Sequence, residues 1–222
     1  YSATKQTNMQ LKKDGVLLVD SGGQYKYGTT DITRTFALNN VSDEFKHDYT
    51  LVLKAHIALA SAKFKYGTYD IDLDKLVRKV MNKEHKDFKH GTGHGIGFML
   101  NVHEGPQSIR KTKVHPTIME CGMVTSDEPG YYLESKYGIR HENEILCVKG
   151  KDDMLKFENL TYVPFDLDGL DISMLNKKEI NYLNKYHQMV YHKISKYLTD
   201  SEREYLAYAT RKVEYDTNKL SK

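Results

Sequence analysis

The stretch His90-Gly91-Thr92-Gly93-His94-Gly95-Ile96-Gly97 is followed, three residues later, by Asn101-Val102-His103-Glu104-Gly105-Pro106. Three histidines therefore fall within fourteen residues, with glycines between and beside the first two. Glycine allows backbone conformations that other residues avoid and lets a ligand approach closely. Imidazole is the commonest metal ligand and a proton carrier near neutral pH. The pattern predicts a functional loop, although a single histidine in a loop is most often only exposed.

Two aspartates in the N-terminal part of the chain extend this prediction. Residues 15–20 are a short apolar run that ends in Asp20 and is typical of a buried strand. Residues 31–37 alternate in polarity and predict a returning strand that begins at Asp31. A hairpin would bring the two carboxylates together, where they repel unless a proton or a cation lies between them. The local alternative for Asp20 is the start of a turn over Ser21-Gly22-Gly23.

Further acidic residues lie beyond the histidine loop. Glu128 precedes Pro129-Gly130, a turn signal, so we expect it where a strand meets a turn. Residues 138–148 predict another strand. Because side chains alternate between strand faces, one face carries Arg140, Glu142 and Glu144. A charged strand face is usually solvated, and that interpretation stays open here. His141 points to the opposite face and is interpreted as structural.

Two helices are expected between these strands. The first begins after Ser42, an N-cap residue followed by acids, carries apolar residues at helical spacing and ends at Gly67. His56 lies on its apolar face and is interpreted as a core histidine rather than a ligand. The second helix begins near Asp70. Residues 106–116 are charged and rich in turn residues, and we expect an exposed loop.

The last third of the chain has a different character. Residues 180–194 carry apolar side chains at helical spacing, and a shorter helix is expected from about Thr199. The polar tail after Val213 is expected to fray. We therefore divide the chain into residues 1–150, with the candidate site, and residues 151–222, a mostly helical extension.

Composition limits the class of protein. The 222 residues suffice for one large domain or a domain with an appendage. No apolar run reaches the roughly 20 residues that span a bilayer, and the net charge of +3 without a basic stripe argues against nucleic acid. The two cysteines, Cys121 and Cys147, are too few for a disulfide framework and are expected to be buried. Because the chain begins at Tyr1 without an initiator methionine, an N-terminal portion is expected to be missing.

Several separate motifs occur in a single order along the chain. They are Asp20-Ser-Gly-Gly-Gln-Tyr, Gly28-Thr-Thr-Asp-Ile-Thr-Arg-Thr, His90 to Gly97, Asn101 to Pro106, Ser126-Asp-Glu-Pro-Gly-Tyr-Tyr and Gly138-Ile-Arg-His-Glu-Asn. Together they resemble the catalytic domain of aminopeptidase P, the Xaa-Pro aminopeptidases among the pita-bread metallopeptidases. The chain from Phe157 onward resembles the C-terminal extension of the longer members. The resemblance implies an α+β pita-bread fold, in which helices flank a curved antiparallel sheet.

The resemblance also implies a centre of two divalent metal ions, usually Mn²⁺. The positions that match the family's metal ligands are Asp20, Asp31, His94, Glu128 and Glu142. A ligand set of one imidazole and several carboxylates suits manganese better than it suits a metal that prefers thiolate ligands, such as structural zinc. Glu128 also matches the general base. His90 and His103 match histidines that contact the substrate and stabilise the tetrahedral intermediate. Arg140 matches a residue that orients a ligand carboxylate, and Tyr132 matches a wall of the site.

The implied activity is hydrolysis of the bond between an N-terminal residue and a following proline, in the cytoplasm. The implied partners are peptides with proline second, and neither nucleic acid nor a membrane. One alternative is a prolidase, which cleaves only Xaa-Pro dipeptides. Others are a non-catalytic peptide-binding module of the same fold and a fragment that folds only with its missing portion. The C-terminal helices are expected either to form a homodimer interface or to cap their own domain.

Overall fold

The structure is a computed structural model that describes residues 4–99 and 101–215. Its strands are β1 (Gly15–Tyr25), β2 (Gly28–Leu38), β3 (Lys63–Lys65), β4 (Val124–Asp127), β5 (Gly130–Leu133), β6 (Tyr137–Arg140), β7 (Asn143–Lys149) and β8 (Met154–Asn159). Its α-helices are α1 (Asp43–Ala60), α2 (Asp70–Asn82), α3 (Lys177–Ile194) and α4 (Asp200–Ala209). The strands form antiparallel sheets with the orders β1-β2, β3-β8-β7-β4 and β5-β6. The expected α+β class is confirmed. Tyr1 and the tail residues 216–222, on which two predictions depend, lie outside the described residues.

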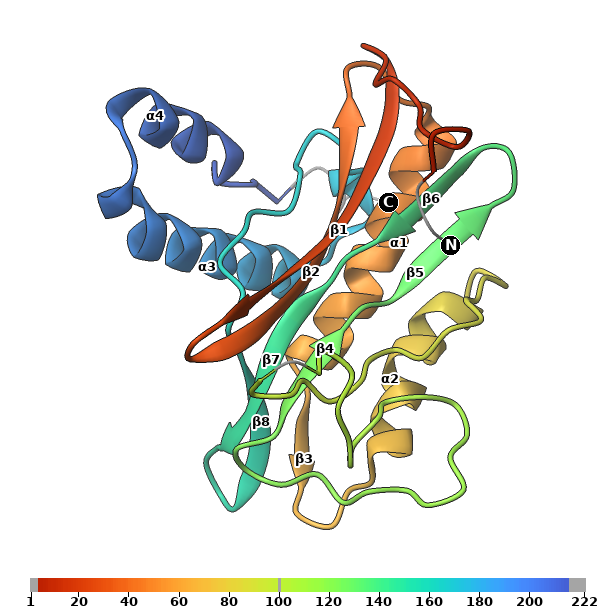
Figure 1. Cartoon of the computed structure of the whole chain (residues 1–222), viewed down its shortest axis with the longest axis vertical. Helices are drawn as coiled ribbons and strands as arrows, with labels where there is room; N and C mark the ends of the chain where they lie inside the picture. Colours follow the sequence, from red (N-terminus) through yellow and green to blue (C-terminus); the bar gives the residue numbers. More distant parts are fainter. Residues whose placement is uncertain (1–3, 100, 216–222) are drawn as a thin grey trace.

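The N-terminal hairpin is longer than the sequence predicted. β1 continues past Asp20, which pairs with Thr33, and two residues further on Gly22 pairs with Asp31. The turn interpretation of Asp20 is therefore wrong. The glycine serves close strand approach instead, since a Cβ on Gly22 would lie 2.5 Å from the carbonyl oxygen of Thr30. Asp20 and Asp31 share one face of the hairpin, offset by two residues, as diagonal cross-strand neighbours. Figure 1 shows the hairpin running diagonally through the molecule, with α3 and α4 on one side and α2 on the other.

Helix α1 begins as predicted and ends earlier. The hydroxyl of Ser42 accepts a hydrogen bond of 3.1 Å from the backbone N–H of Phe45, which caps the first turn. His56 is fully buried, as expected for a core histidine. The helix ends at Ala60 rather than Gly67, because the residues in between form β3, which pairs with β8. A helical spacing of apolar residues cannot reveal this long-range pairing. Helix α2 begins where it was predicted.

The strand expected over residues 138–148 is broken in two. β6 pairs with β5, whereas β7 pairs with β4 and β8. Between the two strands, His141 turns into the core, where its ring lies 4.3 Å from the ring of Tyr49. Glu142 is only 1% exposed, so the charged residues of this segment do not form a solvated face. The change of sheet partner leaves Glu142 between two strands and directs its side chain into the candidate site.

The loop over residues 106–116 is anchored rather than simply exposed. Asp70, at the start of α2, is fully buried. Its carboxylate accepts hydrogen bonds from the backbone N–H of Ser108 at 3.0 Å and from the ammonium of Lys113 at 2.7 Å. One buried carboxylate therefore ties both ends of the loop to α2, and the loop forms a wall beside the histidines.

The two cysteines differ from their prediction. Cys147 is buried in β7, but Cys121 is exposed. Cys121 lies in a turn before β4 that is closed by a hydrogen bond of 3.3 Å from the N–H of Met123 to the carbonyl of Glu120. The N–H of Gly122 donates a hydrogen bond of 2.9 Å to the carbonyl of Cys147, which joins the turn to β7. An apolar run in the sequence did not distinguish this turn from a strand. Among the described residues, no helix has the length and apolar character needed to cross a membrane.

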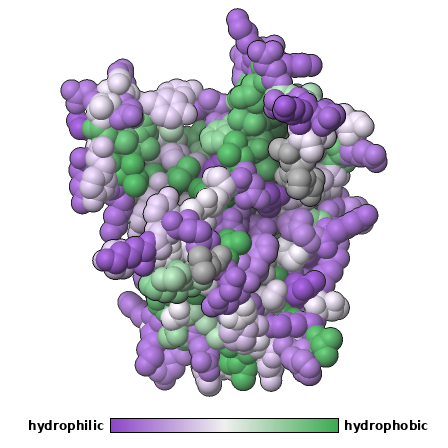
Figure 2. Space-filling model, viewed as in Figure 1, coloured by the Kyte–Doolittle hydropathy of each residue, from purple (hydrophilic) through white to green (hydrophobic). Residues whose placement is uncertain are grey.

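The C-terminal helices form as predicted. A capping box between Asn176 and Glu179 starts α3, and its stripe of Ile180, Leu183 and Val190 is buried. The side of the molecule in Figure 2 is largely polar, with apolar patches beside α4 and near the open end of the β1–β2 hairpin. The division of the chain at residue 150 stays a prediction; β8, which follows that point, pairs with β7 in one sheet.

Replacing Asp70 with alanine should lower the free energy of unfolding by about 3 kcal/mol, because it leaves a half-buried ammonium and buried N–H groups without their partner. Asp72 is the matched control, since it lies on the same helix, is partly exposed and forms its ion pair with the exposed Lys75. Asp72→Ala should change the free energy by less than about 0.5 kcal/mol. Urea denaturation measures both, and equal losses would contradict the anchoring role of Asp70.

Candidate metal centre

The acidic residues and the histidine loop converge on one cleft. Side-chain ligand atoms lie within 4.8 Å of one another in each of the overlapping groups Asp20–Asp31–Glu142, His94–Glu128–Glu142 and Asp31–His94–His103. Glu142 belongs to the first two groups, and Asp31 belongs to the first and third. Shared carboxylates between adjacent groups suit two neighbouring cations better than one. The cleft beside these side chains has a volume of about 370 Å³.

Glycines place His94 against the strand that leads to Glu128. A Cβ on Gly93 would collide with the backbone carbonyl of Ser126, at the end of β4. The close approach allows hydrogen bonds from the N–H of Ser126 to the carbonyl of His94 at 2.9 Å and from the N–H of Glu128 to the carbonyl of Thr92 at 2.8 Å. The glycine-rich loop therefore runs beside β4, and this contact sets the distance between His94 and Glu128.

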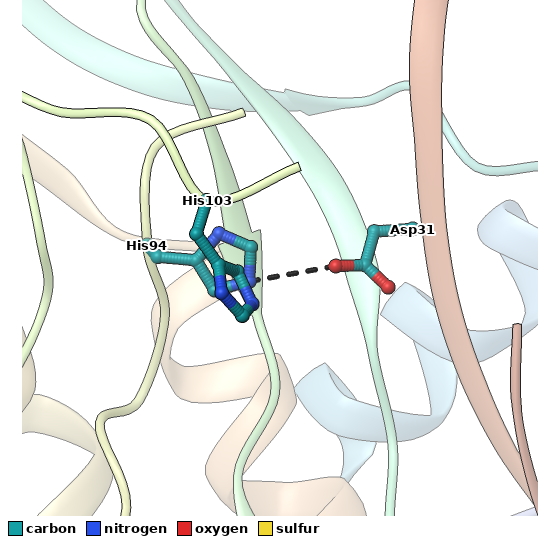
Figure 3. Close-up of side chains that lie close together, drawn as sticks. All are labelled: Asp31, His94 and His103. Atoms are coloured by element: carbon teal, nitrogen blue, oxygen red, sulfur yellow. Dashed lines mark ion pairs between the residues drawn. The ribbon is translucent and has the colours of Figure 1, made fainter. Parts of the chain in front are cut away.

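His94 bridges two carboxylates. Its Nε2 lies 3.4 Å from Oδ2 of Asp31 and 3.2 Å from Oε1 of Glu128. Figure 3 shows the imidazole directed at Asp31, with the ring of His103 beside it. Burial opposes protonation of His94, but the hydrogen bonds to Asp31 and Glu128 outweigh it and raise its pKa to about 10. Positive charge is therefore favoured at this point between the carboxylates.

Glu142 carries the most crowded carboxyl group of the cluster. Burial, and then the nearby Glu128 and Asp31 carboxylates, raise its pKa to about 8. The hydroxyl of Thr33 donates a hydrogen bond of 2.6 Å to its Oε2. Behind it, Oε1 of Glu144 accepts a hydrogen bond of 2.8 Å from the N–H of Asp31, and burial raises the pKa of Glu144 to about 7. Protons or cations relieve the repulsion between carboxylates that are held this close. This oxygen-rich set of side chains fits hard divalent ions.

One wall of the cleft is a chain of hydrogen bonds. Arg140 donates to the carboxylate of Asp20, to the hydroxyl of Tyr132 at 2.9 Å and to the hydroxyl of Thr33 at 3.1 Å. The hydroxyl oxygen of Tyr132 also lies at a hydrogen-bond distance of 2.8 Å from Nε2 of His90. Burial lowers the pKa of His90, so its ring is favoured in the neutral form. Arg140 thus orients Asp20, and Tyr132 orients His90.

All the predicted ligands come together, but the histidines are not equivalent. His103 is exposed, and its ring centroid lies 4.1 Å from that of His94. His103 is close enough to Asp31 and His94 to join a ligand group, so its expected role as a substrate contact stays a prediction. His90 belongs to no ligand group within the described part of the chain.

Two residues that hold the candidate ligands were not predicted from the sequence. Thr33 contacts Glu142 and Arg140, and Ser126 donates 2.9 Å to Oε1 of Glu128. A signal for Thr33 was present, since it follows Asp31 by two positions and must share its strand face. No comparable signal identifies Ser126, because its contact with Glu128 depends on how the chain leaves β4.

Comparisons with known proteins agree with this site. The family model for metallopeptidase family M24 matches residues 1–149, and the model for the C-terminal region of peptidase M24 matches residues 153–213. A relative from Laccaria bicolor, named probable Xaa-Pro aminopeptidase P, is 42% identical over 87% of this chain and 31% of its own length. The chain thus spans about a third of that relative.

Two solved structures are also similar. An X-prolyl aminopeptidase from Caenorhabditis elegans, described as a cytosolic enzyme with a di-nuclear active site, has a TM-score of 0.90 at 40% identity and covers 95% of this chain and 36% of its own. A prolidase from Pyrococcus furiosus has a TM-score of 0.59 at 28% identity and covers 67% of this chain and 41% of its own. These matches confirm the expected pita-bread fold.

Gly93→Ala should lower the free energy of unfolding by about 2 kcal/mol, because the methyl group forces the loop away from β4. Gly91→Ala is the matched control in the same loop. Its added Cβ would meet its nearest heavy atom at 3.4 Å, an ordinary contact. Thermal or urea denaturation compares the two variants, and a tolerated Gly93→Ala would show that the loop does not depend on this approach.

The metal-free protein should lose stability as the pH rises from about 5 to 8. The folded-state pKa of Glu142, about 8, lies above its ordinary value of 4.5, so the folded state binds more protons in this window and stability falls with rising pH. His94 extends the loss from its ordinary pKa of 6.5 towards 10. Urea titrations in a chelating buffer measure the slope. Glu142→Gln should flatten the decline between pH 5 and 8, and an unchanged slope would remove Glu142 as its source.

Proposed function

Because the chain belongs to metallopeptidase family M24, we propose that it is the catalytic part of an aminopeptidase that uses two metal ions. It hydrolyses the peptide bond between an N-terminal residue and a following proline. The single observation that carries the proposal is the overlap of the ligand groups through Asp31 and Glu142, since shared carboxylates provide two adjacent cation positions. The activity, the peptide substrates and the metal ions are all part of this proposal.

In this proposal Asp20, Asp31, His94, Glu128 and Glu142 hold the two divalent ions. We propose Mn²⁺, because carboxylate oxygens dominate the donor set and no cysteine thiolate is near it among the described residues. When bound, such ions supply a nucleophile from water at neutral pH and polarise the substrate carbonyl. The protein must therefore position the peptide, move the protons and stabilise the developing negative charge.

Glu128 is the proposed general base. Its Oε1 is held by the hydroxyl of Ser126 at 2.9 Å and lies beside His94, and Glu128 lines the cleft directly after β4. It takes the proton of the attacking water and delivers it to the proline nitrogen that leaves. His103, exposed at the cleft, is the better-placed donor to the developing oxyanion, because Nε2 of His90 already faces the hydroxyl of Tyr132. His90 and Tyr132 then line the substrate, and Arg140 holds Asp20.

The prolidase alternative has weaker support. Similarity to the aminopeptidase from C. elegans extends over 95% of this chain, against 67% for the prolidase from P. furiosus. A non-catalytic binding module of the same fold would not need a complete set of candidate ligands in overlapping groups. We therefore favour the aminopeptidase over both.

The remaining predictions from the sequence belong to the same proposal. We propose a cytoplasmic protein, in line with the relative from C. elegans that is described as cytosolic. Its partners are peptides with proline at the second position. The C-terminal region, residues 151–222, either joins two copies as a homodimer or caps its own chain, and the oligomeric state in solution separates these roles.

Hydrolysis of a tripeptide with proline second should require Mn²⁺, and Glu128→Gln should lower kcat at least about 100-fold, because the amide cannot accept the proton of water. Glu120→Gln is the matched control, because Glu120 is an exposed glutamate before β4 that belongs to no ligand group among the described residues, and it should keep the activity. A chromatographic assay of the released residue measures all three proteins.

Substrate length is included in the same assay. Cleavage of a dipeptide but not of the tripeptide would favour the prolidase. Activity that ignores the metal, or a Glu128→Gln variant as active as the original chain, would contradict the proposal. A chain that neither binds Mn²⁺ nor hydrolyses either peptide would favour the non-catalytic binding module, which would not need the ligand set. Metal that binds without any hydrolysis would contradict the activity proposed for this chain and leave its metal ligands standing.

A further inference from the structure

Arg34 is a buried cation whose hydrogen-bond partners, among the residues that the structure describes, are all neutral groups. It is 3% exposed. Its guanidinium donates to six oxygen atoms, the carbonyls of Thr33, Glu142, Val163 and Pro164, the amide of Asn143 and the hydroxyl of Tyr186. It also lies 4.1 Å from the centre of the Phe165 ring. A buried charge normally needs a charged partner, so such an arrangement calls for a specific reason.

One side of the guanidinium holds the backbone of Glu142. Nη1 of Arg34 donates 2.5 Å to the carbonyl of Glu142 and 2.9 Å to that of Thr33. The N–H of Glu142 donates 3.1 Å to the same carbonyl of Thr33. Glu142 lies in the break between β6 and β7, outside the strand ladders, so these bonds to β2 hold its backbone. The hydroxyl of Thr33 then fixes the carboxylate at 2.6 Å.

The other side of the guanidinium reaches the C-terminal region. Nη2 donates 2.7 Å to the carbonyl of Val163 and 3.0 Å to the hydroxyl of Tyr186, and Nε donates 3.0 Å to the carbonyl of Pro164. Tyr186 belongs to α3 and is 3% exposed. Arg34 points away from the cleft, because it follows Asp31 by three positions along β2 and so lies on the opposite strand face. One rigid group therefore spans from α3 to the candidate metal ligand.

We propose that Arg34 is a positioning residue through which helix α3 sets the location of the Glu142 carboxylate in the metal centre. The inference rests on the ligand role proposed for Glu142. A planar guanidinium fixes several acceptors in one geometry, which a lysine ammonium cannot reproduce. Residues that orient metal ligands from behind tune metal affinity even though they never touch the ion. The C-terminal region is thereby part of the metal centre.

The test is the affinity for Mn²⁺, measured by isothermal titration calorimetry on the full chain and on single variants. Arg34→Lys keeps the charge but loses the planar guanidinium, and it should weaken Mn²⁺ binding about tenfold or more. Tyr186→Phe keeps the ring in place and removes only the hydroxyl on α3, and should weaken binding in the same direction by a smaller factor. Circular dichroism establishes that each variant is folded at the titration temperature.

Lys54→Met is the matched control. Lys54 on α1 also binds the C-terminal region, with bonds of 2.7 Å to Glu179 of α3 and 2.8 Å to the carbonyl of Met174, but it does not reach Glu142. It should lower the melting temperature of the metal-free protein and leave the Mn²⁺ affinity unchanged. A purely structural role for Arg34 predicts the same pattern for Arg34→Lys and Tyr186→Phe as for Lys54→Met.

The outcomes separate this inference from the proposed function. Weaker binding in Arg34→Lys and Tyr186→Phe, with normal binding in Lys54→Met, supports it. Unchanged affinity in Tyr186→Phe, or an equal loss in Lys54→Met, overturns it while the metal centre stands. If the unaltered chain binds no Mn²⁺, the metal centre and this inference are both overturned.

Discussion

Repulsion among carboxylates in a shared, partly buried cleft is the constraint on which the structure depends. Asp20, Asp31, Glu128 and Glu142 lie in overlapping groups, and the burial of Glu142 weakens the screening of its charge by water. The fold holds them there through strands and neighbouring side chains, and His94 between two of them is charged well above its ordinary pKa. A protein that stabilises positive charge at this point even without an ion is organised for cations.

Backbone contacts rather than large side chains bring the histidine loop to that cleft. Gly93 and Gly95 leave no room for a Cβ, because the carbonyls of Ser126 and Glu104 occupy the space. The loop is thus joined to β4 on one side and to the segment before Pro106 on the other. His94 and Glu128 come from separate parts of the sequence, yet their separation is set by main-chain hydrogen bonds, which vary less than side-chain contacts.

The sequence predicted those features that local chemistry decides. The cap at Ser42 and the start of α2 were found from residue types alone, and the approach of Asp20 and Asp31 followed from the predicted hairpin. Predictions from local patterns were wrong where the structure depends on pairing with a distant segment. Glycines that look like a turn after Asp20 instead serve close strand pairing, and the strand break at Glu142 reflects a change of sheet partner. Arg34 lies within one of the motifs, but nothing in the local sequence indicates that it reaches a helix some 150 residues further along the chain.

The motifs of the candidate site and the C-terminal helices look separable in the sequence, but contacts in the structure join them. β8 completes the sheet that contains β7, and Arg34 joins β2 to α3. The similarity to the prolidase covers 67% of the chain, whereas that to the aminopeptidase covers 95%. If the additional part only covered the surface, a buried cation with neutral partners would be an unnecessary burden on stability. Its position behind Glu142 gives a physical reason for keeping it, because the same group that secures α3 also secures a carboxylate of the proposed metal centre.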